Sequence, residues 1–150
     1  MDSYKSLGAW EVAHQLVIQT LTVLDGHPSG PRTWAPFDQL RRAAVSVEAN
    51  IVEGYAAGTG PLFRRHLRIA IGSAAECECL INIAAERHYL TGTDVSSLEE
   101  LASATIAVLY GLIRSPRLLH FSAHRSQRTA PSSQLTAPRS QRPAPSSQRT

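Results

Sequence analysis

The sequence is poor in the residues that define several classes of protein. Its 150 residues include two cysteines, nine glycines, one methionine and 6% aromatic residues. Two cysteines are too few for a disulfide scaffold, and nine glycines exclude a collagen-like chain. No apolar run reaches the roughly 18 residues that a transmembrane helix needs. We therefore expect one soluble domain, with or without a tail.

The N-terminal segment lacks the features of a secretory signal. Residues 1–15 show no basic start followed by an apolar core. Without such a signal, we expect a cytoplasmic protein with reduced cysteines and no contact with a membrane.

Acidic residues are missing from the last thirty residues of the chain. Residues 1–120 carry ten Lys and Arg against twelve Asp and Glu, a net charge of −2, whereas residues 121–150 carry five Arg and no acid. The net charge of +3 therefore comes from the last thirty residues. It gives no argument for nucleic-acid binding by residues 1–120.

Residues 121–150 form a low-complexity Arg/Ser/Gln/Pro tail that contains a repeat. RSQRTAPSSQLTAP at 125–138 is followed by RSQRPAPSSQRT at 139–150. Such a segment cannot bury enough apolar surface to offset its ordering entropy, so we predict a disordered tail after a domain at 1–120. The tail is either an arm that contacts phosphates or a solvated extension without a role. Its sparse arginines favour the second interpretation.

Four segments of residues 1–120 have the three-four apolar spacing of amphipathic helices. Breaks rich in Gly and Pro separate them, and no segment alternates with a period of two. Ser97 and Glu100 predict a capping box at the start of the fourth segment. Short connections make neighbouring helices antiparallel, so the sequence predicts an all-α, up-down-up-down four-helix bundle. The predicted helices span 9–25, 36–57, 61–89 and 97–114.

The apolar positions of these segments predict the core. In the first and fourth helices they are Trp10, Ala13, Val17, Leu21 and Leu24, and Leu98, Leu101, Thr105, Val108 and Leu112. In the second and third they are Leu40, Ala44, Val47, Ile51 and Gly54, and Phe63, Leu67, Ala70, Ala74, Cys77, Ile81 and Ala84. The small residues Gly54 and Gly72 indicate that the second and third helices approach closely.

Two helices carry a second apolar strip beyond what one core face requires. The strips consist of Val12, Leu16 and Val23 in the first helix, and Ile69, Leu80 and Ile83 in the third. They indicate either a wider core or a subunit interface, and they favour a homo-oligomer.

No motif points to catalysis, a metal or a cofactor. Glu11-x-x-His14 has the spacing found in di-iron bundles, but such a site needs a second copy of the motif, which the chain lacks. Cys77 and Cys79 lie about 200° apart around a helix and cannot share a metal. There is no phosphate-binding loop, nucleophile elbow or zinc spacing. We therefore predict that the protein is not an enzyme.

A polar stripe runs along the second helix, at Arg42, Ser46, Asn50 and Glu53. Arg65, Ser73 and Glu76 of the third helix are placed to face it. One interpretation is a hydrogen-bond network that sets the register within the bundle or between subunits. The other is a ligand or nucleic-acid surface, in which Glu53 and Glu76 would act as acid and base only within a cleft.

Arginines cluster near the start of two helices. The candidate nucleic-acid contacts are Arg41 and Arg42 in the second helix, and Arg64, Arg65 and Arg68 in the third. Because connected helices are antiparallel, these two groups lie at opposite ends of their hairpin. A closed ring of subunits would repeat each group and build a positive surface. The alternative is ordinary solvated arginine paired with Asp38, Glu48 or Glu86.

Residues 39–54, QLRRAAVSVEANIVEG, resemble the hallmark QLRRAAxSIPxNIAEG of a bacterial family of four-helix bundle proteins. That family was first noticed in intervening sequences of large-subunit ribosomal RNA genes. Tyr4-Lys5-x-Leu7-x-x-Trp10 resembles its start, and Phe63-x-x-x-Leu67-x-Ile69-Ala70-x-Gly72-Ser73-x-x-Glu76 resembles its third helix. The resemblance covers about residues 3–114, and this chain has Glu48 where the family has proline.

The resemblance implies a barrel-shaped pentamer without catalytic residues. Related proteins act as accessory factors of diversity-generating retroelements, in which a basic ring binds nucleic acid and the reverse transcriptase. RNA or DNA and a reverse transcriptase are thus the partners that the resemblance implies. The family's signature positions are Arg41, Arg42, Ser46, Asn50, Glu53 and Gly54, with Glu76 in the third helix.

Two functions remain open on the sequence. The first is a non-catalytic homo-oligomeric bundle that binds nucleic acid or a nucleoprotein partner. The second is a structural or protein-interaction oligomer with no affinity for nucleic acid.

Overall fold

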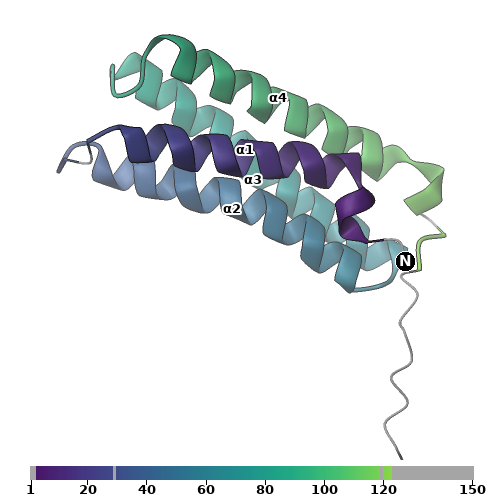
Figure 1. Cartoon of the computed structure of the whole chain (residues 1–150). Helices are drawn as coiled ribbons and strands as arrows, with labels where there is room; N and C mark the ends of the chain where they lie inside the picture. Colours follow the sequence, from purple (N-terminus) through teal and green to yellow (C-terminus); the bar gives the residue numbers. More distant parts are fainter. Residues whose placement is uncertain (1–2, 29, 119, 123–150) are drawn as a thin grey trace, which may run out of the picture.

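Four long helices pack side by side as an antiparallel bundle in the computed structural model (Figure 1). The model describes residues 3–28, 30–118 and 120–122. Each helix packs against two neighbours, α1 and α3 both contacting α2 and α4. The predicted all-α, up-down-up-down bundle is confirmed, and no strand occurs in the described ranges. The elements are η1 (Tyr4–Ser6), α1 (Gly8–Gly26), α2 (Trp34–Ala56), α3 (Gly60–Glu86), α4 (Gly92–Arg114) and η2 (Pro116–Leu118).

The ends of α3 and α4 differ from the predicted ones. Helix α3 ends at Glu86, where His88 takes a positive φ of 56° and the Tyr89 amide donates to the Ala84 carbonyl at 2.8 Å. Helix α4 begins at Gly92, five residues before Ser97. Ser97 therefore lies inside the helix, where its hydroxyl donates to the Asp94 carbonyl at 3.0 Å. The predicted capping box is wrong.

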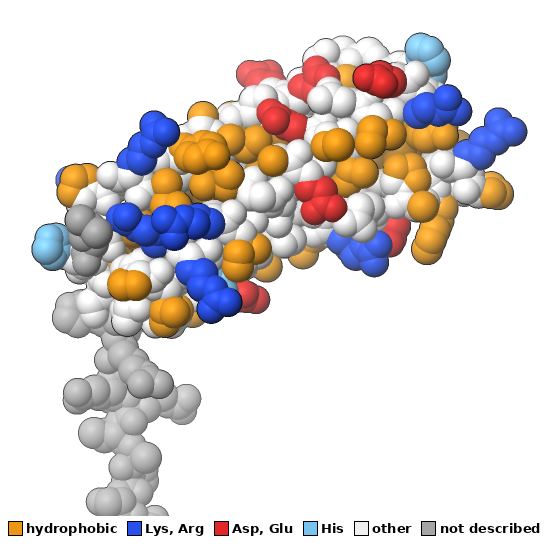
Figure 2. Space-filling view, turned by 180° about the vertical axis from the view of Figure 1, so that it is seen from behind, with side chains coloured by type: hydrophobic (Ala, Val, Ile, Leu, Met, Phe, Trp, Pro, Cys, Tyr) orange, Lys and Arg blue, Asp and Glu red, His pale blue; other side chains and the backbone are white. Residues whose placement is uncertain are grey.

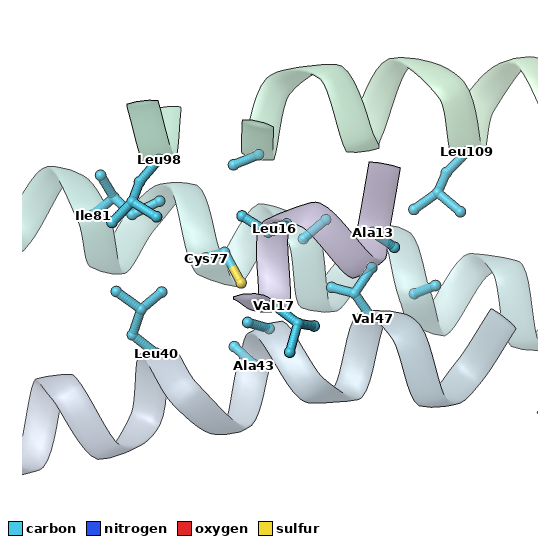
Figure 3. Close-up of a cluster of buried hydrophobic side chains, with 14 of the residues drawn as sticks. Ala13, Leu16, Val17, Leu40, Ala43, Val47, Cys77, Ile81, Leu98 and Leu109 are labelled. Carbon is cyan, nitrogen blue, oxygen red and sulfur yellow. The ribbon is translucent and has the colours of Figure 1, made fainter. Parts of the chain in front are cut away.

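The core is a column of apolar side chains between the helices, most of them Ala, Val, Ile or Leu, with Phe37 and Phe63 also buried in it. Figure 3 shows members of it from all four helices, among them Leu16, Val47, Cys77 and Leu109. Every core position predicted for α2 and α3 is buried. In each of these helices one apolar stripe keeps the three-four spacing along most of the length, whereas the second strip of α3 does not, so periodicity alone identified the inward faces.

The inward faces of α1 and α4 differ from the predicted ones. Leu16 and Val23 of the second apolar strip on α1 are buried, so that strip widens the core. On α4, Val108 is 36% exposed and Leu109 is fully buried, so the prediction for Val108 is wrong. Helix α4 is apolar on more than one side, and spacing alone could not choose between adjacent stripes.

Helices α2 and α3 are in close contact at Gly54. A Cβ atom placed there would lie 2.7 Å from the His66 Cβ and 2.7 Å from the Phe63 Cδ2. Only a residue without a side chain fits such a contact, and the prediction for Gly54 is confirmed. Gly72 is exposed and a Cβ there would meet nothing within 4 Å, so the same prediction for Gly72 is wrong.

The chain beyond α4 turns back over one end of the bundle. The Phe121 ring lies 5.2 Å from the Tyr55 ring and 4.9 Å from the Phe63 ring. Ser122 forms an isolated antiparallel bridge with Thr59. Residues 121 and 122, assigned to the tail on composition, thus pack on the bundle. The rest of the predicted tail, residues 123–150, lies outside the described residues.

One described helix, α4, is long and apolar enough to cross a membrane, with a mean hydropathy of 1.2 over its best window. This is weak evidence for a span, because core helices of soluble proteins pass the same test. Only 22% of that window is buried within the bundle. Among the large apolar residues of α4, Val108 and Tyr110 are exposed.

Candidate nucleic-acid interface

The first arginine group, on α2, is paired with neighbouring acids. An Nη2 atom of Arg41 lies 3.0 Å from Asp25 Oδ1, and Nη2 of Arg42 lies 3.1 Å from Asp38 Oδ2. Arg42 also donates to the Gln39 side chain at 2.9 Å. Two carboxylates thus balance two guanidinium groups, so this end of α2 offers little net positive charge to an anion.

The second arginine group, on α3, has no such partners. No carboxylate pairs with Arg64, Arg65 or Arg68 anywhere in the part of the chain that the structure describes. Arg64 and Arg68 stand on one wall of a groove of about 660 Å³. Because α3 and α4 are antiparallel neighbours, the start of α3 meets the end of α4, and Arg114 lines the other wall.

The groove combines positive charge with apolar and aromatic surface. Ile71 of α3 and Tyr110 and Ile113 of α4 line it together with the three arginines, and none of the described acidic residues does. The guanidinium carbon of Arg114 lies 5.6 Å from the centroid of the Tyr110 ring, within cation–π range. In Figure 2, which views the molecule from behind, Lys or Arg side chains lie beside hydrophobic ones at the left end of the bundle, and further Lys or Arg side chains lie at its right end.

Arg114 was not among the candidate residues. It is one arginine at the end of an apolar helix, and no local cluster marks it in the sequence. Only the pairing of α3 with α4 brings it beside Arg64 and Arg68. Arg65 is exposed nearby but does not line the groove.

The polar stripe of α2 forms a hydrogen-bond network with α3. The Ser46 and Ser73 hydroxyls lie 2.9 Å apart, and Asn50 Nδ2 donates to the Ser46 carbonyl at 2.9 Å. His66 Nδ1 lies 3.2 Å from Asn50 Oδ1 and 3.6 Å from a carboxylate oxygen of Glu53. The stripe thus joins two helices of one bundle, as the register interpretation predicts. His66, which the sequence did not single out for this role, is part of it.

Glu76 takes part in a second set of hydrogen bonds between α2 and α3. Its Oε1 accepts from Gln39 Nε2 at 2.6 Å, and Gln39 in turn accepts from Arg42. Arg65, predicted to face the stripe, forms no hydrogen bond or ion pair with it in the described part of the chain. Glu53 and Glu76 bind different partners, so the structure does not bring these two carboxylates together as an acid–base pair.

Comparison with known proteins identifies the family. The family model described as 23S rRNA-intervening sequence protein matches residues 5–111. The chain belongs to this family. No curated protein matches it.

One solved structure has the same fold as this chain. It is the crystal structure of a protein of unknown function from the S23 ribosomal protein family of Bacteroides thetaiotaomicron, similar with a TM-score of 0.66 and 19% identity. The similarity covers 71% of this chain and 99% of that one. At this identity the match supports the fold alone. Arg114 lies just beyond the residues that the family model covers.

At position 48 this family member uses its glutamate to hold α1 against α2. Trp10 Nε1 donates to Glu48 Oε1 at 2.9 Å, and His14 Nδ1 lies 3.2 Å from the same carboxylate. The His14 ring also stacks on Trp10 with centroids 4.9 Å apart. His14 is thus engaged with α2 rather than with Glu11. Nowhere in the described ranges do three or more His, Cys, Asp or Glu gather as metal ligands.

The two cysteines of this intervening-sequence protein lie in opposite environments. Cys77 is buried in the core, whereas Cys79 is exposed, and both are free. Burial, together with the smaller effect of the nearby Glu76 carboxylate, raises the pKa of the Cys77 thiol to about 12. Cys77 therefore acts as an apolar core residue, as its place in the seam predicts.

Proposed function

We propose that this family member is a non-catalytic homo-oligomeric bundle that binds nucleic acid through the groove between the start of α3 and the end of α4. The observation that carries the proposal is the convergence of Arg64, Arg68 and Arg114 on one groove without an acidic partner in the described chain. Unpaired guanidinium groups bind phosphate through charge-assisted, often bidentate hydrogen bonds. Arg65 extends the positive surface beside the groove.

Arg41 and Arg42 have a smaller part in this proposal. Their pairing with Asp25 and Asp38 means that a phosphate would have to compete with a carboxylate already in place. Exposed ion pairs are weak, but the local net charge still decides how strongly a polyanion is attracted. We therefore assign the main phosphate contacts to the α3–α4 end.

The oligomer is supported by apolar side chains that the bundle leaves outside. Leu62, Ile69 and Ile83 of α3 are 43%, 45% and 43% exposed, and they lie at multiples of seven residues along one side of the helix. Val45 of α2 is 48% exposed. Burying such a stripe against a second copy is the usual reason for its presence. A closed ring, pentameric as the resemblance implies, would repeat the groove once per subunit and bind several phosphates at once.

The test is fluorescence anisotropy with labelled RNA and DNA oligonucleotides at 50 and 200 mM salt. We expect log affinity to fall linearly with log salt, with a slope that decreases by about 0.7–0.9 for each phosphate contact removed. The double variant Arg64→Ala/Arg68→Ala should bind more weakly, and its affinity should depend less steeply on salt. The matched variant Arg41→Ala/Arg42→Ala, which also removes two arginines from a helix start, should lose much less.

The five tail arginines need a separate variant, in which all are replaced by glutamine in the full-length chain. Binding that is lost in this variant and kept in Arg64→Ala/Arg68→Ala would refute the groove assignment. No binding at low salt above that of a protein of equal charge would refute nucleic-acid binding as a whole.

The second candidate is a structural or protein-interaction oligomer without nucleic-acid affinity. It is favoured by the internal use of Arg41, Arg42 and the polar stripe, because these signature positions serve the α1–α2 and α2–α3 contacts. Light scattering that shows an oligomer, together with no binding to any oligonucleotide, would support it. A monomer in light scattering would count against both candidates.

A further inference from the structure

The groove contains more than phosphate binding requires. Contacts to a duplex backbone need cations and polar donors, whereas half of the groove's named residues are apolar or aromatic: Ile71, Tyr110 and Ile113. Tyr110 is 44% exposed, a high value for a ring on the side of a bundle helix. The groove thus offers a flat ring and apolar walls beside its three positive charges.

We propose that the groove binds single-stranded nucleic acid, with one unstacked base against Tyr110 and Ile113 and the flanking phosphates on Arg64, Arg68 and Arg114. The inference rests on the proposed function and specifies its ligand. Aromatic rings beside positively charged grooves are the means by which proteins hold single strands, since every base has a face that stacks. In a duplex those faces are covered by neighbouring base pairs.

The arrangement of the walls fits a base between phosphate contacts. Arg64 and Arg68 are one helical turn apart on α3, so their Cβ atoms lie about 5–6 Å from each other on the same side of the helix. Tyr110 and Arg114 have the same spacing on α4, and their cation–π contact holds ring and guanidinium together. One wall therefore presents two cations, and the other presents a ring next to a third.

The size of the groove also limits its occupant. Its volume of about 660 Å³ lies within the range of about 300–1,000 Å³ that holds single small molecules. A base with its phosphate fits this space, whereas a base-paired helix would contact only its rim. An acidic peptide could pair with the arginines but would leave the tyrosine ring without a planar partner.

The experiment uses the full-length protein and four fluorescein-labelled probes of equal length. They are a 12-nucleotide oligo(dT), its RNA counterpart, an abasic strand with the same phosphates, and a 12-base-pair duplex. We expect the two single strands to bind at least tenfold more tightly than the abasic strand and the duplex. Polyglutamate of matched charge should compete poorly.

Variants of Tyr110 separate stacking from charge. Tyr110→Leu should weaken binding to the single strands roughly 5- to 100-fold, the effect of losing one stacked base. Tyr110→Phe should keep the affinity. Trp34→Leu is the matched control, because Trp34 is an aromatic residue 63% exposed at the start of α2, outside the groove.

The outcomes distinguish this inference from the proposed function. Abasic strand or duplex binding equal to that of the single strands, with dependence on Arg64 and Arg68, would overturn the inference and leave the proposed function standing. Full affinity of the Tyr110→Leu variant for the single strands would also overturn the inference. The same holds if polyglutamate competes as well as unlabelled single strands do. No binding of any probe would overturn both.

Discussion

Replacing Gly54 by alanine tests whether the close approach of α2 and α3 determines the stability of the bundle. The added Cβ would lie 2.7 Å from carbon atoms of both His66 and Phe63, with the Phe63 backbone Cα at 3.4 Å. Real Cβ atoms essentially never come so close, so α2 and α3 must separate or both side chains must move. Phe63 is 1% exposed and packs on Tyr55 and Phe121, which leaves it little freedom.

The magnitude follows from two opposing terms. Overpacking a well-packed core costs about 1–3 kcal/mol. The higher helix propensity of alanine stabilises a helix by at most about 1 kcal/mol relative to glycine. The gain is smaller at Gly54, which lies two residues from the end of α2. We therefore expect Gly54→Ala to lower the free energy of unfolding by about 1–2 kcal/mol. His66 also belongs to the Ser46–Asn50 network, so its displacement adds to the cost.

The matched control is Gly72→Ala, the same change in the middle of α3. Gly72 is exposed and its Cβ would meet nothing within 4 Å, so only the helix-propensity term acts. We expect a gain of about 0.5–1 kcal/mol. Urea unfolding followed by circular dichroism at 222 nm, at one protein concentration because an oligomer unfolds in a concentration-dependent way, measures both. Equal stability of the two variants would refute the close-contact reasoning.

Two further predictions test the core. Leu109→Ala should cost about 2–5 kcal/mol because Leu109 is fully buried, whereas Val108→Ala should change stability by less than about 1 kcal/mol; the reverse order in urea unfolding would mean that α4 is rotated. At pH 8 an alkylating reagent should modify Cys79 rapidly and Cys77 only after denaturation, because a pKa near 12 leaves almost no thiolate in the folded state. Mass spectrometry after digestion reads this out, and fast modification of both native thiols would contradict it.

Local sequence patterns were enough for α2 and α3 and for the family. In both helices one apolar stripe keeps the three-four spacing along most of the length, and all of its predicted core positions are buried. The hallmark segment at 39–54 led to the family that the match over residues 5–111 shows. For α1 and α4 the pattern was ambiguous, because a helix with apolar residues on several sides has more than one plausible inward face. On α4, packing against α1 and α3 places Leu109 in the core and leaves Val108 exposed.

The candidate site, too, could be predicted only in part from the sequence. The arginine clusters could be seen in the sequence, but which of them are neutralised could not. Asp25 lies on α1 and reaches Arg41 across the α1–α2 contact, at a distance of 16 residues along the chain. Likewise, Arg114 joins Arg64 and Arg68 only because α4 runs back beside α3.

The sequence by itself determined the helices, their antiparallel order and the core positions of α2 and α3. These features depend on spacings within one helix and on short connections. Tertiary structure alone decided which charges remain free, where the groove lies and which of Gly54 and Gly72 lies at the close contact between α2 and α3. Those properties depend on distances between atoms of different helices, and no periodicity within a single helix encodes them.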